Sequence, residues 1–199
     1  MVTIKASDVQ ALRERTNVGM LDCKKALEEA NGDIEKAIII LREKGIAKAA
    51  KRADKEAKEG QIYSFIHQGN KLGVLLEINC ETDFVARTED FTKLAKEFAM
   101  QIAATNPVGI SKEDVPQDKI EQELEIAKKQ LLAEGKPAQI IEKIIPGKLE
   151  KYYSEVCLLE QASVKDPSVK MKDILNEYKL KTGENLIVKR FIRFQLGEN

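Results

Sequence analysis

Residues 72–80 carry the pattern that most restricts how this chain can fold. Every second residue there is apolar: Leu72, Val74, Leu76, Ile78 and Cys80. Strict alternation places these side chains on one face of a β-strand that has one buried face. A second strand is expected over 62–68, and Gly69-Asn70 between the two is a two-residue hairpin signal. The sequence therefore predicts a β-hairpin packed against a core on one side.

The strand leads into a short connection that contains an acid and a large aromatic residue. The connection reads Asn-Cys-Glu-Thr-Asp-Phe-Val-Ala-Arg over 79–87. Thr88 can then cap a helix with apolar positions at Phe91, Leu94, Ala95, Phe98 and Ile102. Loops on a rigid scaffold commonly carry function. From the residues alone, Phe84 either packs beneath its own loop or projects toward a partner.

Three short helices are predicted for residues 1–45. Ser7 begins a capping-box pattern, Gly19 precedes the second helix, and Asp33 can cap the third, which we expect to end at Gly45. Residues 46–59 are mostly Ala, Lys, Arg, Asp and Glu, which indicates a charged helical linker. We therefore expect a three-helix domain, a linker, and a second domain over 60–199.

The second domain is predicted to be an α+β core. A helical hairpin is expected over 116–146, turning at Gly135-Lys136-Pro137 and interrupted in its second arm at Pro146-Gly147. A late helix follows with Met171, and the last strand is expected over 186–196. Strands far apart in sequence with helices between them favour a small, mostly antiparallel, three-stranded sheet packed with helices.

Composition excludes several classes of function. Lysine plus arginine and aspartate plus glutamate number 33 each, whereas a nucleic-acid-binding domain is usually basic. The three cysteines are far apart and fit no metal or disulfide spacing, which favours reduced thiols in a cytoplasmic protein. The first residues lack the apolar stretch of a signal peptide, and no apolar run is long enough for a membrane span.

Chemistry-bearing residues are scarce. His67 is the only histidine, so one chain cannot build a two-histidine metal site, and any histidine-dependent triad would have to use His67. Neither the P-loop nor the dinucleotide-binding glycine pattern occurs. We therefore expect no enzyme activity, no metal and no cofactor.

Three stretches together resemble a known family. The first is Thr-Asp-Phe-Val at 82–85; the second is the N-terminal run from Leu12 through Gly19-Met20-Leu21 to Glu35; the third is Gly-Glu-Asn at 183–185 running into 190–194. In order and over nearly the whole chain, these resemble the short form of the bacterial elongation factor Ts family. The resemblance implies a UBA-like N-terminal bundle and guanine-nucleotide exchange on elongation factor Tu, which the chain would bind in its GDP-bound and nucleotide-free forms.

The resemblance also implies which residues meet the partner. They are Thr82, Asp83, Phe84 and Val85 at the magnesium and phosphate region; Leu12, Arg13, Met20 and Leu21 in the N-terminal domain; and, more weakly, His67, Gln68 and Gly69 at the hairpin tip. Longer family members carry a second copy of the core, so the resemblance implies a homodimer and a 2:2 complex with Tu.

Two rival functions remain open. One is a non-catalytic interaction module, because small three-helix bundles also occur as ubiquitin-binding or scaffold domains. The other is RNA binding through residues 42–58, although Glu43, Asp54 and Glu56 oppose it.

Overall fold

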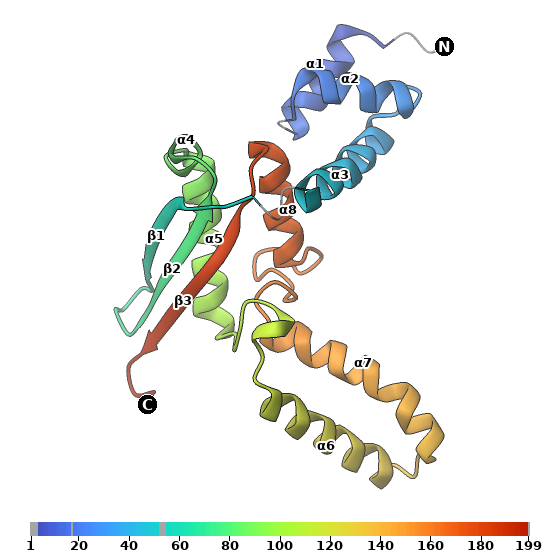
Figure 1. The fold of residues 1–199 in the computed structure, drawn as a ribbon, viewed down its shortest axis with the longest axis vertical. Helices are drawn as coiled ribbons and strands as arrows, with labels where there is room; N and C mark the ends of the chain where they lie inside the picture. Colours follow the sequence, from blue (N-terminus) through green and yellow to red (C-terminus); the bar gives the residue numbers. More distant parts are fainter. Residues whose placement is uncertain (1–3, 17, 52–54, 199) are drawn as a thin grey trace. The chain divides into compact units, whose positions relative to one another are not determined.

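The structure is a computed structural model that describes residues 4–16, 18–51 and 55–198. Three helices come first, α1 (Ala6–Thr16), α2 (Met20–Glu29) and α3 (Ile34–Lys51). Then follow β1 (Glu59–Ile66), β2 (Leu72–Cys80), the single turn α4 (Asp83–Ala86) and α5 (Glu89–Thr105). The remainder is η1 (Lys112–Asp114), α6 (Gln117–Ala133), α7 (Ala138–Val156), α8 (Met171–Thr182) and β3 (Ile187–Gln195). Figure 1 labels the α-helices and the strands.

The contacts of the chain define two compact units. The first contains 1–61, 78–94 and 174–187, and the second contains 62–77, 95–173 and 188–199. The division expected from the sequence at 45 and 60 stays a prediction.

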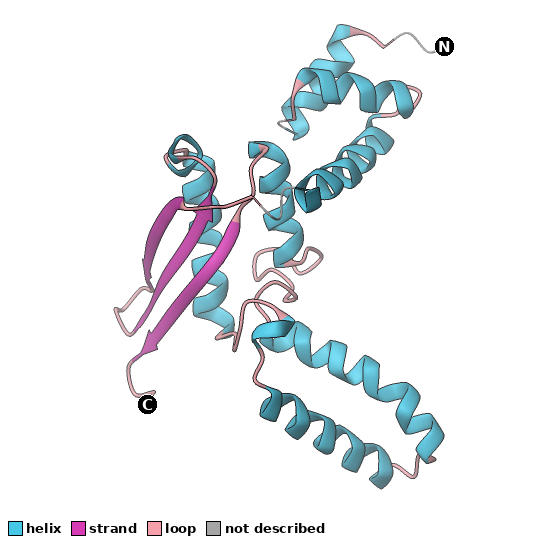
Figure 2. Ribbon diagram, in the orientation of Figure 1, coloured by secondary structure: helices cyan, strands magenta, loops and turns pink. Residues whose placement is uncertain are grey.

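The predicted α+β class is confirmed, with three N-terminal helices and a three-stranded antiparallel sheet in the order β1-β2-β3 (Figure 2). The Leu196 N–H donates to the carbonyl of Lys71 at 2.8 Å, and Arg190 donates to Glu77 at 2.6 Å. These two pairs fix the antiparallel register of β2 against β3, since each step forward on one strand is a step back on the other.

One face of the sheet packs on α5, and the other is open. The even-numbered residues of β2 from Val74 to Cys80 are buried, as the alternation predicts. They share the core with the predicted apolar positions of α5, Phe91, Leu94, Ala95, Phe98 and Ile102, all fully buried. Thr88 caps this helix, because its hydroxyl accepts from the N–H of Phe91 at 3.2 Å.

Four local expectations are wrong. The first helix begins at Ala6, and the Asp8 carboxylate accepts from the N–H of Lys5, so Ser7 lies inside the helix rather than capping it. Helix α3 passes through Gly45, and the glycine there leaves room for Leu180 rather than ending the helix: a Cβ at this position would meet Leu180 Cδ1 at 2.6 Å. Part of the predicted linker is therefore helix α3, while residues 52–54 lie outside the described residues.

The other two errors concern a turn and a proline. The His67 N–H donates to the carbonyl of Leu72, so four residues separate this pair and the hairpin does not turn on Gly69-Asn70 alone. Helix α7 continues through Pro146 rather than breaking there. The α6–α7 hairpin itself is present, with Gly135 in the left-handed region at φ 75° between its arms.

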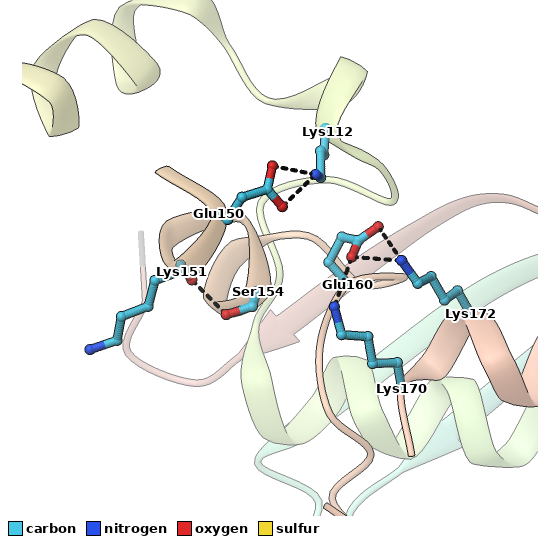
Figure 3. A network of polar contacts seen from close by, with 7 residues as sticks. All are labelled: Lys112, Glu150, Lys151, Ser154, Glu160, Lys170 and Lys172. Carbon is cyan, nitrogen blue, oxygen red and sulfur yellow. Dashed lines mark hydrogen bonds and ion pairs between the residues drawn. The ribbon is translucent and has the colours of Figure 1, made fainter. Parts of the chain in front are cut away.

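Lysine–glutamate pairs join η1 to α7 and connect the segment after α7 to the start of α8 (Figure 3). Glu160 accepts from Lys172 at 3.0 and 3.1 Å and from Lys170 at 3.2 Å, and Lys112 donates to both oxygens of Glu150. Burial raises the pKa of Glu160, but its two lysine partners outweigh burial and the pKa is lowered. The carboxylate therefore stays charged where α8 begins.

Candidate functional site

The predicted functional loop is a single helical turn with its own cap. We call residues 81–87 the Phe84 turn. The Thr82 side chain accepts from the N–H of Val85 at 3.4 Å, which caps α4. At the other end, the Thr88 hydroxyl donates to the carbonyl of Val85 at 2.8 Å while capping α5. The connection is therefore an ordered turn between two caps.

Phe84 projects into solvent from this turn. Its side chain is 80% exposed, whereas Ala86 on the opposite side of the turn is buried and Val85 is half-buried. Of the two arrangements that the sequence left open for Phe84, the ring projects outward and does not pack beneath its own loop. Asp83 is half-buried and pairs with Arg87 at 2.9 Å.

Residues from distant parts of the chain hold the Phe84 turn. The carboxylate of Glu184, just after α8, accepts from the N–H groups of Glu81 and Thr82 at 3.0 and 3.1 Å and from the Thr82 hydroxyl at 2.5 Å. Gln61 in β1 donates to the carbonyl of Ala86 at 2.6 Å. The turn is thus tied near both of its ends to other parts of the same unit.

The N-terminal bundle presents a second apolar surface. Met20 and Leu21, at the start of α2, are exposed, and so is Arg13. A hollow of about 440 Å³ is lined by Ile4, Ala6, Val9, Met20, Leu21 and Lys24. Leu12, expected from the resemblance to contact the partner, is fully buried in the bundle core and has no side-chain surface to offer a partner.

The hairpin tip is a separate place. His67, Gln68 and Gly69 are exposed and precede β2, whereas the Phe84 turn follows β2. The two are therefore separated by a nine-residue strand. The tip stays a weak prediction of a contact.

The described residues include no exposed thiol and no cluster of metal-binding side chains. Cys23, Cys80 and Cys157 are buried, and burial raises the pKa of each thiol, that of Cys80 and of Cys157 to about 11. Within the described residues, no group of three or more His, Cys, Asp or Glu side chains could hold a metal ion. No helix in that part of the chain has the length and apolar character to cross a membrane.

The exposed phenylalanine on its tethered turn and the apolar hollow of the N-terminal bundle are both surfaces suited to binding another protein. The fold and site define a protein-binding factor. A family model for "Elongation factor TS" matches residues 2–198. The chain belongs to the elongation factor Ts family, whose members are non-enzymatic nucleotide exchange factors for elongation factor Tu in translation elongation.

Curated relatives agree over whole chains. The chain is 59% identical to elongation factor Ts of Caldanaerobacter subterraneus subsp. tengcongensis over 195 residues, which are 98% of each chain. It is 58% identical to that of Fervidobacterium nodosum, covering 98% of this chain and 99% of the relative. It is 54% identical to that of Desulfosudis oleivorans over the full length of both. The family resemblance drawn from the sequence is confirmed.

Sequence reasoning did not find the residues that support the turn. Glu184 was noticed only as part of a family pattern, and Gln61 and Arg87 were not singled out. Glu184 lies more than 100 residues from the groups it contacts. A single sequence contains no periodicity or spacing that pairs such distant positions.

Proposed function

We propose that this chain accelerates GDP release from elongation factor Tu by inserting Phe84 into Tu's nucleotide-binding domain beside the magnesium and phosphate region. The observation that carries the proposal is the 80% exposure of Phe84 on a turn tied at both ends. A large apolar side chain held out in water gains free energy when a partner covers it.

The expected effect on nucleotide follows from the charge of the magnesium ion. Mg²⁺ neutralises the phosphates of bound GDP, so displacement of its ligands weakens nucleotide binding. Asp83 lies next to Phe84 and would meet polar groups of the partner. Linkage makes the effect reciprocal: a factor that lowers Tu's affinity for nucleotide is itself released when nucleotide rebinds.

Phe84 cannot supply the whole effect. Full burial of one such side chain contributes about 1.5–3 kcal/mol, roughly a ten- to hundredfold change in an equilibrium. Other contacts must share the task. Arg13, Met20 and Leu21 on the N-terminal bundle are the proposed second contact, with the apolar hollow beside them to receive a partner side chain.

The test is stopped-flow release of labelled GDP from Tu. Phe84→Ala should slow the maximal release rate by about tenfold or more, since the insertion energy is lost. Val164→Ala, which also removes an exposed apolar side chain, serves as the matched control and should leave the rate unchanged. Equal acceleration by the wild type and the Phe84→Ala variant would refute the proposed role of the ring.

The rival interaction module makes a different prediction in the same experiment. It would bind Tu without changing the release of GDP. Exposed aromatic side chains are also common at interfaces that only dock, so the change in the rate of GDP release, and not the exposure of the ring, separates the two functions.

We also propose that two chains associate through the open face of the sheet. This face carries exposed apolar side chains from all three strands, and Leu196 just after β3 adds another: Ile62, Ile66, Leu75, Ile192, Phe194 and Leu196. From the β2–β3 register, Leu75 lies opposite Ile192 and Gly73 lies opposite Phe194. A contiguous apolar face of this kind marks an interaction site, and a second copy presents the same surface to it. The complex with Tu would then contain two chains of each protein.

A further inference from the structure

The carboxylate of Glu184 accepts hydrogen bonds from the Phe84 turn through both of its oxygens. Its Oε2 accepts from the N–H groups of Glu81 and Thr82, and its Oε1 accepts from the Thr82 hydroxyl. Both oxygens are therefore occupied by groups at the start of the turn. Hydrogen bonds to an ionised acceptor are about twice as strong as neutral ones, so three of them to one carboxylate hold the start of the turn more firmly than neutral hydrogen bonds would.

The tether is reciprocal. Glu81 accepts from the N–H of Asn185 at 2.6 Å, and the amide of Asn185 donates to the carbonyl of Lys55 at 3.0 Å. The two segments thus exchange hydrogen bonds in both directions. Asn185 is buried and Glu184 is half-buried, which limits the water that could compete for these groups.

The tether acts on the residues next to Phe84 and leaves the ring free. Thr82, which donates its N–H and its hydroxyl to Glu184, also caps the turn that carries Phe84. Fixing Thr82 therefore fixes the direction in which α4 leaves the strand. Helix α8 is itself held, because Leu180 packs against Gly45 and the core of the N-terminal bundle.

We propose that Glu184 is a positioning residue for exchange: it holds the Phe84 turn in the conformation from which the ring enters the partner. The inference rests on the proposed function of Phe84. Glu184 does not itself contact Tu in this account. Its loss lets the turn sample other conformations, so the fraction of molecules ready to insert the ring falls.

The experiment measures the maximal rate of GDP release from Tu at saturating factor. Glu184→Ala removes all three hydrogen bonds; if the turn is then competent a tenth of the time, the rate falls by about tenfold. Glu177→Ala is the matched control, because Glu177 is a nearby glutamate on α8 that pairs with Lys181 instead of the turn. The control should keep the wild-type rate.

A double-mutant cycle separates positioning from a general structural role. If Glu184 acts through Phe84, then adding Glu184→Ala to Phe84→Ala should slow release by less than about twofold further. Independent, multiplying losses would overturn the inference. A slow Phe84→Ala variant beside a normal Glu184→Ala variant would also overturn it while leaving the proposed function intact. A normal Phe84→Ala variant would instead refute the proposed function.

Fluorescence anisotropy of a tryptophan in the turn measures the mobility of the turn directly. The chain contains no tryptophan, so the Phe84→Trp variant has a single such fluorophore. Adding Glu184→Ala should lower the fluorescence anisotropy of this variant in the free protein, and unchanged anisotropy would contradict the tether. Should Glu184→Ala melt at a much lower temperature, Glu184→Gln, which keeps one acceptor oxygen of the side chain but removes its charge, makes the same test in a milder form. Release and anisotropy unchanged in Glu184→Gln would then count against the inference.

Discussion

The guanidinium of Arg87 lies 2.9 Å from the carboxylate of Asp83, one helical turn earlier in the Phe84 turn. The Arg87 side chain is exposed, and exposed pairs at this spacing contribute about 0.3–0.5 kcal/mol to stability. Arg87→Ala should therefore lower the midpoint of thermal unfolding by no more than about 2 °C. Differential scanning calorimetry measures this, and a drop several times larger would mean that the pair, rather than Glu184, holds the turn.

Replacing Gly60 with alanine should destabilise the fold, because this position has no room for a side chain. Its φ is 144°, and a Cβ there would lie 2.2 Å from the carbonyl oxygen of Ile78. Gly60→Ala should cost at least about 2 kcal/mol in the free energy of unfolding, through backbone strain and displacement of β2. Gly147→Ala is the control, since nothing lies within 4 Å and a helical alanine should gain about 0.5–1 kcal/mol. Urea denaturation should show a lower free energy of unfolding for Gly60→Ala and a higher one for Gly147→Ala. Changes of the same sign in both variants would refute the prediction.

The open sheet face predicts an association that one charge should disrupt. Phe194 is 67% exposed at the centre of β3's outer apolar residues. Phe194→Asp should shift sedimentation equilibrium from dimer toward monomer, because an unpaired carboxylate would be buried at the interface. Leu132→Asp on α6, at a residue 60% exposed, should leave the distribution unchanged. A wild-type protein that sediments as a monomer at micromolar concentration would exclude the dimer.

The buried thiols predict a loss of stability at high pH. Burial, aided by nearby carboxylates, raises the pKa of Cys80 and Cys157 from the ordinary 9.0 to about 11 in the folded state. The unfolded chain therefore releases these protons first as pH rises. The stability that the neutral thiols contribute is fully present below about pH 9 and is lost as pH rises toward about 11.

Urea denaturation over that range measures the effect. A Cys80→Ala, Cys157→Ala double variant, compared with its own stability at about pH 8, should decline less steeply than the wild type, because the lysines titrate alike in both proteins. Parallel curves would show that the two thiols contribute nothing to the pH dependence.

The regular elements of this fold follow from periodicity. The alternation from Leu72 to Cys80 correctly gave the buried face of β2, and the spacing of Phe91, Leu94, Phe98 and Ile102 gave the buried face of α5. Local errors arose where tertiary contacts override local signals. Gly45 looks like a helix stop, yet the helix continues there, and the missing side chain leaves room for Leu180.

The functional turn was only partly predictable. The acid–aromatic pair after the strand drew attention to Asp83 and Phe84, but the turn that carries the ring is hydrogen-bonded to Glu184 and Gln61, which lie far away in sequence. Leu12 shows the converse, since a family pattern treats as a surface contact a residue that the bundle buries. Which members of a pattern reach solvent is decided by packing.

The most direct test of the central claim compares GDP release from Tu with and without free Mg²⁺. If Phe84 acts by disturbing the magnesium site, Phe84→Ala should release GDP about tenfold more slowly than the wild type in millimolar Mg²⁺, and the gap should close once a chelator removes the ion. A gap of the same size under both conditions would contradict the account, because the ring would then be acting on something other than the metal.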